Sequence, residues 1–435
     1  QGQIEALEHH ASDEIKAVYL PKLISGEWNG TMNLTEPQAG SDVGALRTKA
    51  VPNGDGTYAV TGQKIYISYG DNDITEYTCH LVLARLPDGA PGTKGISLFM
   101  VPKRLPDAQG NAGEANSLRV VSLEHKMGLH ASPTAVMEYD GATGWLVGQK
   151  HGGMAAMFTM MNNARLGVGV QGIGIAEGAF QHALSYAQDR KQGGKGAIIE
   201  HADVRRMLTE MKAATFAARA IALACGVAID MSSATHDDAW TARAAFLTPI
   251  AKAFGTDVGV DVASSGVQVH GGMGYIEETG AAQFARDVRV TSIYEGTNGI
   301  QAMDLVTRKL MDGGETAHRL LDEIEADAEA TRQTLPELAE PVWQACESLR
   351  EATEWLVSQE DLSERFAVAT AYLRAFARVL GGHYHLRAAR ASSDARKALA
   401  RFYIERLLPE HVSLSAQARA GAGTVFAVSA DDLAA

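Results

Sequence analysis

The chain has 435 residues, with 39 Lys and Arg against 52 Asp and Glu and a formal charge of -13. A chain of this length accommodates about three domains with their own apolar cores. The acidic balance, without a long basic run, argues against nucleic acid or an anionic membrane surface as the main partner.

The three cysteines lie far apart and form no CxxC spacing. They indicate a reducing compartment without a disulfide framework or a zinc site, so we expect a cytoplasmic protein with no bound metal. The polar and acidic start, residues 1–15, is not typical of a secretory signal. The least charged stretch, residues 152–176, carries Arg165 and many glycines, and it predicts a buried helix rather than a membrane span.

Residues 1–30 predict one helix, from about Ser12 to Leu23, followed by a turn at Gly26. A lone helix cannot bury an apolar face, so we expect the end of an N-terminal helical domain that is mostly missing from the chain. From residue 31 to 149, short apolar runs are bounded by Gly, Pro, Asn and Asp and lack helical periodicity. This pattern predicts a small antiparallel β-barrel or sandwich.

Residues 150–311 predict a four-helix bundle. Long apolar helices are expected over about 153–190, 200–231 and 237–269, and a fourth helix follows Thr297. Many small residues in these helices allow close packing.

Residues 315–435 predict an additional helical domain, with a loosely held tail after Pro409. The link from Asp312 to Gly314 is too short to tether an independent domain. The apolar faces of these helices must be buried, so we expect them to pack on the rest of the chain. The whole is therefore predicted to be an α+β multidomain protein.

The stretch around Glu295 places a carboxylate between an aromatic ring and a glycine. Thr297 can cap a following helix that runs to Leu310 and ends at Gly313. Glu295 is therefore expected on a short turn, and Gly296 lets another group approach its backbone. A carboxylate held in this way is suited to a general base, and a solvated acid favoured by the helix dipole is the alternative.

Four other segments carry binding or packing signals. Residues 35–42 form a turn-rich connection that suits a phosphate, a ring edge or an ordinary loop. The glycines of 268–275 either end a helix or let a flat or anionic cofactor lie on the backbone, but they are not a dinucleotide-binding fingerprint. Arg165 interrupts an apolar helix and needs an ion pair or a ligand. Four methionines within 154–161 indicate core packing or an adaptable apolar pocket.

Taken together, these motifs resemble the acyl-CoA dehydrogenase family. The matching pieces stand in family order at residues 34–37, 39–43, 62–68, 164–165, 186–190, 268–275, 286–287 and 294–297. Residues 315–435 resemble the extra helical domain of the larger members. The resemblance implies a middle β domain and a C-terminal four-helix bundle with FAD between them. It also implies dehydrogenation of an acyl-CoA to the trans-2-enoyl-CoA, as in fatty-acid β-oxidation.

By the same resemblance, Glu295 removes the α-proton while the β-hydride passes to flavin N5. Contacts to FAD are implied for Met32, Leu34, Thr35, Tyr66, Ser68, Arg190, Gln268, Gly271, Gly272 and Thr297. Contacts to acyl-CoA are implied for Ser41, Asn162, Arg165, Tyr294 and Gly296. In the family some of these residues reach the FAD of a neighbouring subunit, so a homodimer is implied.

The residues leave several alternatives open. The implied electron acceptor is an electron-transfer flavoprotein, and an acyl-CoA oxidase or a non-catalytic binding or scaffold protein of the same fold are the rival interpretations. Short, long, branched and sulfur-containing acyl chains all fit the sequence. The chain departs from the family pattern where Tyr66 and Ser68 replace the common Trp and Thr, and where Asn162 replaces a common Asp.

Overall fold

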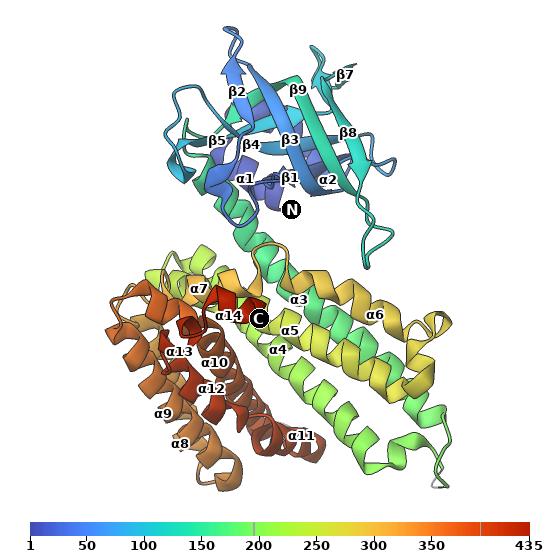
Figure 1. Ribbon diagram of the computed structural model, residues 1–435, viewed down its shortest axis with the longest axis vertical. Coiled ribbons are helices and arrows are strands. Elements are labelled where there is room, and N and C mark those ends of the chain that lie inside the picture. The colour runs from blue at the N-terminus through green and yellow to red at the C-terminus, as the bar shows by residue number, and fades with distance from the viewer. Residues whose placement is uncertain (195, 392) are drawn as a thin grey trace. The chain divides into compact units, whose positions relative to one another are not determined.

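The computed structural model describes residues 1–194, 196–391 and 393–435, except the side chain of Asn162. It divides into two compact units, Gln1–Ala164 and Arg165–Ala435 (Figure 1). Each unit is described by itself.

Two helices open the first unit, α1 (Gly2–His10) and α2 (Asp13–Ser25). The Ser12 hydroxyl accepts a hydrogen bond from the Ile15 N–H, and Gly26, at φ 79°, ends α2. A capping residue is extended, so α1 must end before Ser12 can cap α2. The single helix predicted for this segment is the second of the two, and α1 was missed.

Short strands make up most of the first unit. Seven of them form one sheet: β1 (Trp28–Asn33), β2 (Lys49–Pro52), β3 (Tyr58–Ser68), β4 (Tyr77–Arg85), β5 (Ile96–Pro102), β8 (Leu118–Leu123) and β9 (Thr134–Val147). The order is β1-β4-β2-β3-β9-β5, and the pairing of β4 with β5 closes the sheet into a ring. A separate hairpin joins β6 (Arg104–Pro106) to β7 (Ala112–Ala115).

The β prediction is confirmed, but the sheet is mixed rather than purely antiparallel. β1 runs parallel to β4, with Trp28 opposite Tyr77 and Asn33 opposite Val82. Apolar alternation and turn residues locate strands, but they do not fix the direction in which strands far apart in the chain pair. The missed feature is therefore a long-range pairing.

Two apolar cores lie on the two faces of the sheet. Leu81 and Leu83 of β4 pack toward the N-terminal helices, and Val82 and Ala84 pack within the ring. This division follows from the alternation of side chains along a strand. The methionines within 154–161 join the first of these cores, so their stripe is core packing.

The second unit contains the predicted bundle. Its helices are α3 (Gly153–Asp189, which begins in the first unit), α4 (Ala202–Thr235), α5 (Asp238–His270), α6 (Ala281–Val288) and α7 (Asn298–Val306). Gly169 and Gly172 let α3 approach the α5 backbone closely, because a Cβ at either position would lie 2.6–2.7 Å from a carbonyl oxygen of α5. The short helix α6 was not predicted.

Helix α4 is long and apolar enough, by length and composition, to cross a membrane, and 39% of its most apolar window is buried. Its inward-facing residues, among them Met211, Ile221 and Cys225, pack in the core of the bundle. A core helix passes the same test of length and composition.

The C-terminal helices pack on the bundle, as the short link predicts. They are α8 (Glu315–Thr331), α9 (Pro336–Ser358), α10 (Leu362–Ala391), α11 (Asp394–Arg406), α12 (Glu410–Ala418), α13 (Gly423–Phe426) and α14 (Ala430–Ala434). The rings of Phe246 and Phe376 meet at 5.0 Å, and an ion pair of 2.5 Å joins Arg243 to Glu323.

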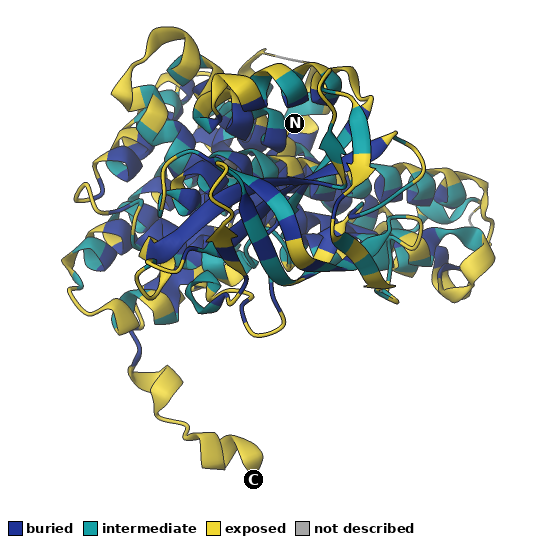
Figure 2. Ribbon diagram, turned by 90° about the horizontal axis from the view of Figure 1, so that it is seen from above, coloured by how far each residue is buried: buried dark blue, intermediate teal, exposed yellow. Residues whose placement is uncertain are grey.

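Two predicted boundaries in this unit are wrong. The tail after Pro409 is not loose at first, because Leu414 and Ser415 of α12 are buried, and only α13 and α14 are exposed (Figure 2). The helix after Thr297 ends at Val306 rather than near Leu310. Leu310 is nevertheless buried, so its apolar character reports burial in a turn and not a continuing helix.

Candidate active site

Glu295 lies on the predicted turn before α7, and both it and Gly296 have left-handed backbones, at φ 55° and 80°. The Thr297 hydroxyl caps α7 by accepting the Ile300 N–H at 3.2 Å. Gln301 Nε2 donates to the carbonyl oxygens of Glu295 and Gly296, at 3.3 and 3.2 Å. A non-glycine residue with positive φ persists only where its surroundings enforce it, and such residues cluster at functional sites.

Arg165 finds the structural partner that the sequence demanded. It is buried and forms an ion pair with Asp304 at 3.1 Å, and Asp304 also accepts Arg308 Nε at 2.7 Å. The predicted acyl-CoA contact is therefore held as an ion pair within the second unit. Its charge still acts on Glu295.

Lys252 was missed by the sequence analysis, although it is the one charged residue in the apolar run between Arg243 and Asp257 of α5. It is fully buried, and its ammonium donates to Asn298 Oδ1 at 2.9 Å. Asn298 is the first residue of α7, and its Nδ2 donates to Asp257 Oδ1 at 2.7 Å. A charged residue inside an apolar helical run was the signal that could have found this contact.

The Glu295 carboxyl group is desolvated but unpaired. Burial raises its pKa, and the positive charges of Arg165 and Lys252 oppose that rise. In the described part of the chain, no hydrogen bond or ion pair reaches this carboxylate. Burial lowers the pKa of Lys252 to about 8, against the attraction of Asp257 and Glu295. A carboxylate of raised pKa without a fixed partner is free to accept a proton.

Tyr294 is anchored to α3, because its hydroxyl donates to Gln171 Oε1. Burial raises the pKa of this phenol. The hydroxyl of this predicted acyl-CoA contact is thus already engaged. The remaining predicted contacts of that kind are Ser41, which is exposed in the first unit, and Asn162, whose side chain lies outside the described residues.

A hollow of 520 Å³ at the C-terminal end of α5 brings three predicted FAD contacts together, namely Arg190, Gly271 and Gly272. A Cβ placed on either glycine would meet no atom within 4 Å, so the bare backbone is open to a ligand. Gln268 is exposed in the last turn of α5. A guanidinium beside open backbone suits phosphate oxygens, so these residues fit the phosphate part of a dinucleotide.

The hollow and the Glu295 turn are separate sites within the second unit. The hydrogen bond from Lys252 to Asn298 shows that the Glu295 turn lies beside Lys252 of α5, and Gly271 follows the end of that helix. At 1.5 Å per residue, these two positions lie about 28 Å apart along the α5 axis. The structure therefore divides the predicted residues of this unit into two groups.

The first unit holds the remaining predicted FAD contacts on two adjoining segments. The group comprises Met32, Leu34, Thr35, Tyr66 and Ser68, on β1, the residues after it, and β3. The Ile65 N–H donates to the Thr35 carbonyl oxygen at 3.0 Å and joins the two segments. A bulge between Lys64 and Ile67 gives Tyr66 a φ of 62° and leaves it 62% exposed. The bulge thus turns this ring outward.

An ion pair between Glu36 and Lys64 holds these two segments together. Both side chains are buried, and Lys64 Nζ lies 2.9 Å from Glu36 Oε1. Lys64 Nζ also donates to the Leu34 carbonyl oxygen at 3.0 Å. Glu36 accepts the N–H groups of Arg47 and Thr48, at 2.6 and 3.0 Å. The connection predicted at 35–42 is therefore a loop fixed by a buried ion pair, which sequence reasoning did not assign.

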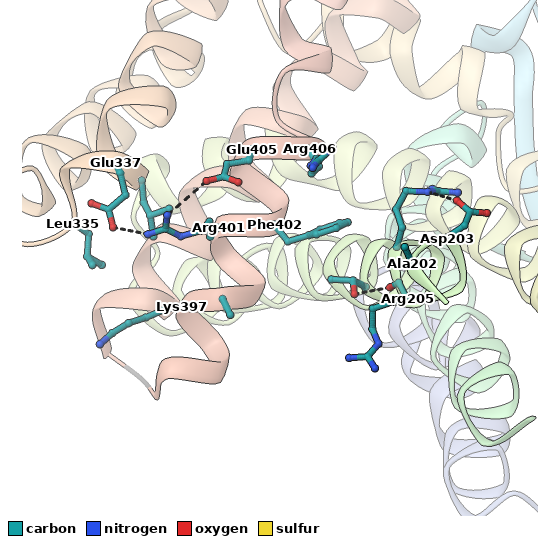
Figure 3. A pocket seen from close by; sticks show the side chains of 14 residues that line it. Ala202, Asp203, Arg205, Leu335, Glu337, Lys397, Arg401, Phe402, Glu405 and Arg406 are labelled. Carbon is teal, nitrogen blue, oxygen red and sulfur yellow. Dashed lines mark hydrogen bonds and ion pairs between the residues drawn. The ribbon is translucent and has the colours of Figure 1, made fainter. Parts of the chain in front are cut away.

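A larger hollow of 960 Å³ lies elsewhere, between α4, α9 and α11 (Figure 3). None of the predicted site residues lines it. Two ion pairs lie in its lining: Arg401 pairs with Glu337 at 2.9 Å, and Arg206 pairs with Asp203 at 2.8 Å. Size alone therefore does not identify the candidate active site.

Three family models match successive parts of the chain. They describe the acyl-CoA dehydrogenase middle domain at residues 31–142, the acyl-CoA dehydrogenase C-terminal domain at 151–311, and an acetyl-CoA dehydrogenase C-terminal-like region at 320–429. The second match contains the Glu295 turn and the 520 Å³ hollow.

The chain is also similar to individual members. It is 54% identical over 337 residues to a 3-methylmercaptopropionyl-CoA dehydrogenase of Ruegeria pomeroyi, a match that covers 75% of this chain and 57% of that protein. It is 38% identical over 411 residues to a butyryl-CoA dehydrogenase of Syntrophomonas wolfei, covering 88% of this chain and 67% of that protein.

Among solved structures, ACDH-11 of Caenorhabditis elegans, determined in complex with C11-CoA, shares the fold. Its TM-score is 0.82 at 24% identity, and the match covers 94% of this chain and 70% of that one. The chain therefore spans between about half and two thirds of the length of the curated relatives named above. From the domain matches and the identity to these relatives, the chain belongs to the acyl-CoA dehydrogenase family.

Proposed function

We propose that this chain catalyses the FAD-dependent αβ-dehydrogenation of an acyl-CoA thioester to the trans-2-enoyl-CoA, with Glu295 as the base. The observation that carries the proposal is the left-handed turn at Glu295, whose carboxylate is desolvated and free of hydrogen bonds among the described residues. Family membership supplies the reaction class to which such a base belongs.

In this proposal Glu295 takes the α-proton of the thioester. Desolvation favours the neutral acid that forms, and the charges of Arg165 and Lys252 favour the ionised carboxylate that precedes it. The α-proton can be removed only if the developing enolate charge is stabilised by donors in a dry site. We assign that role to the backbone N–H of Glu295, which approaches the thioester oxygen beside Gly296.

FAD, when bound, supplies the two-electron acceptor for the β-hydride. The ring end is assigned to residues of the first unit, namely Met32, Leu34, Thr35, Tyr66 and Ser68. The phosphate and adenosine end is assigned to Arg190, Gln268, Gly271 and Gly272 at the 520 Å³ hollow, and Thr297, which lies at the Glu295 turn, is assigned to the cofactor bound at that turn. Arg190→Ala is expected to purify with less flavin, whereas Arg206→Ala, whose side chain does not line the 520 Å³ hollow, is expected to keep it.

A homodimer accounts for the separation of the two groups in the second unit. The hollow lies about 28 Å from the level of Glu295 along α5, so we assign it to the cofactor of a second copy. Light scattering on the intact protein tests this assembly. A dimer is expected, and a monomer or a tetramer would contradict it.

The acyl group is proposed to be short. Two relatives are named for butyryl-CoA and 3-methylmercaptopropionyl-CoA, which are both small acyl groups, one of them with sulfur.

We propose an electron-transfer flavoprotein as the electron acceptor. We also propose the cytoplasm as the location, since the free cysteines Cys79, Cys225 and Cys346 are buried and suit a reducing compartment.

A panel of acyl-CoAs, mixed anaerobically with the yellow protein, tests the reaction and its rivals. Short straight and sulfur-containing acyl-CoAs are expected to bleach the flavin, and electron-transfer flavoprotein is expected to restore the colour faster than air does. Rapid recovery in air alone would identify an acyl-CoA oxidase. A flavin that no acyl-CoA bleaches would identify a binding or scaffold protein and overturn the proposal.

A further inference from the structure

Lys252 is an unusual buried charge. Its side chain is inaccessible to solvent, and in the part of the chain that the structure describes no carboxylate lies within 4.0 Å of its ammonium. Its hydrogen bond goes to the amide oxygen of Asn298, at 2.9 Å. A buried ammonium is costly unless it is paired or serves another group nearby, so this position calls for an explanation.

Asn298 ties the start of α7 to α5. Its Nδ2 donates to Asp257 Oδ1 at 2.7 Å, to Thr256 Oγ at 3.0 Å and to the Ala253 carbonyl oxygen at 3.3 Å. At the same time, its Oδ1 accepts a hydrogen bond from the Lys252 ammonium. The first residue of α7 is thus fixed to one face of α5 by its own side chain, and Glu295 stands three positions earlier.

The two cations near Glu295 differ in how their charge is balanced. Arg165 has a direct carboxylate partner in Asp304, at 3.1 Å. Lys252 has only an amide partner, and Asp257 lies beyond that amide. The charge of Lys252 is therefore less neutralised locally and remains available to act on Glu295.

We propose that Lys252 is a positioning residue of the Glu295 site, which fixes the catalytic turn through Asn298 and holds a buried positive charge near the carboxylate. The proposal rests on the proposed function of Glu295 as a base. It assigns Lys252 and Asn298 one combined role, in which the amide sets the geometry of the turn and the ammonium, together with Arg165, favours the ionised form of the base.

Other charges around the turn are fixed by their own partners or lie farther along the helices. They are Arg165 of α3, Asp257 and Asp261 of α5, Asp304 and Arg308 of α7 with Lys309 after it, Arg374 of α10, and Tyr294 of the turn itself. Removing the Lys252 charge leaves these residues present and raises the pKa of Asp257, which the Lys252 charge lowers. A movement in the titration of Glu295 then reports the loss of Lys252 and its effect on Asp257.

The first test follows the protonation of Glu295 without substrate. The carboxylic-acid infrared band that is lost in Glu295→Gln is recorded against pH in otherwise matched proteins. In Lys252→Met its midpoint is expected to rise by about one pH unit or more, because an opposite charge favours the carboxylate. Lys252→Arg is expected to restore the wild-type midpoint, and an unchanged midpoint in Lys252→Met overturns the proposal.

Thr248→Val is the matched control. Thr248 is buried on α5 one turn before Lys252 and bonds to the Ala244 carbonyl oxygen of its own helix. It is expected to leave the midpoint where it is. If Lys252→Met does not fold, Lys252→Gln removes the same charge with a polar side chain and must show the same upward shift.

The second test separates geometry from charge. Asn298→Ala keeps the ammonium but removes the tether, so flavin bleaching is expected to slow about tenfold or more, as for a displaced catalytic group, with the pH midpoint near wild type. A wild-type rate in Asn298→Ala overturns the tethering role. If no acyl-CoA bleaches the wild-type flavin, the proposed function fails, while the infrared titration still decides whether Lys252 acts on Glu295.

Discussion

Glu36 in the first unit is buried and Glu295 in the second is half-buried, and the surroundings of the two acids differ. Glu36 meets Lys64 at 2.9 Å and accepts two backbone N–H groups. Burial opposes its ionisation, yet the Lys64 charge and these hydrogen bonds lower its pKa to about 2. Glu295 has no such partners among the described residues, and burial raises its pKa.

The difference shows what pairing does to a buried acid. A carboxylate whose lone pairs are all engaged is held in its charged form and stabilises a loop, but it cannot readily accept a proton. A carboxylate facing cations that lie beyond bonding distance stays reactive. We therefore interpret Glu36 as a structural clamp and Glu295 as a base, although both precede a glycine-containing turn or loop.

The largest expected effect on stability comes from breaking the Glu36–Lys64 ion pair. Glu36→Ala leaves Lys64 buried without its partner, and the free energy of unfolding should fall by about 3–5 kcal/mol. Urea unfolding followed by tryptophan fluorescence, to which the buried Trp28 of the first unit contributes, measures it. Glu295→Gln is the matched control and should leave stability unchanged or slightly higher, because it removes a half-buried charge that has no bonded partner among the described residues. Equal losses in the two variants would abolish the distinction between the two acids.

Lowering the pH should change the contributions of the two carboxyl groups to folding stability in opposite directions. The pKa of Glu36 falls from 4.5 to about 2 on folding, so its stabilisation is present above the unfolded value and is lost as pH falls toward 2. The loss amounts to roughly 3 kcal/mol at 1.36 kcal/mol per unit. Glu295 acts in the opposite direction, because its raised pKa favours proton uptake by the folded state. Unfolding curves of wild type and Glu36→Gln between pH 5 and 2 should converge as the pH falls, and parallel curves would contradict this assignment.

A side chain at Gly296 should distort the base without touching it. Its φ of 80° and a Cβ only 2.7 Å from Gln301 Nε2 make Gly296→Ala strained, at about 1–3 kcal/mol. Flavin bleaching should slow as well, because the strain falls on the turn. Gly299→Ala is the control inside α7, where Ala is favoured over Gly by about 0.5–1 kcal/mol. A wild-type bleaching rate in Gly296→Ala would show that the turn tolerates displacement.

The smallest effect concerns the cap. Thr297→Ala removes the acceptor of the Ile300 N–H and should lower the free energy of unfolding by about 1 kcal/mol. Thr297→Ser keeps a hydroxyl and should recover most of the loss. Thermal unfolding of wild type and the two variants is the measurement. A serine variant as unstable as the alanine variant would contradict the claim that the Thr297 hydroxyl stabilises α7.

Local chemistry predicted the Glu295 turn well. A threonine cap and a glycine beside the acid act within a few residues, so the sequence shows them directly. The end of α7 was misplaced because the apolar spacing that continues to Leu310 reports burial as readily as a helix. The same ambiguity allowed α6 to be overlooked.

Long-range pairs were not predictable in the same way. Periodicity marks Lys64 and Lys252 as charges in apolar surroundings, but it does not say that one meets Glu36 and the other Asn298. The parallel pairing of β1 with β4 was missed for the same reason, since it joins segments far apart in the chain. The family resemblance assigned site residues by their positions in the sequence. The supporting contacts made by Glu36, Lys64, Lys252 and Asn298 could be identified only from the fold.

The most direct test of Glu295 as the base is the rate of anaerobic flavin bleaching by a short acyl-CoA in wild type and in Glu295→Gln, with equal flavin content in both proteins. The account predicts a yellow variant whose bleaching is slower by roughly 10²–10⁴, the usual contribution of a positioned general base. A variant that bleaches at a near-normal rate would contradict the assignment of Glu295 as the base.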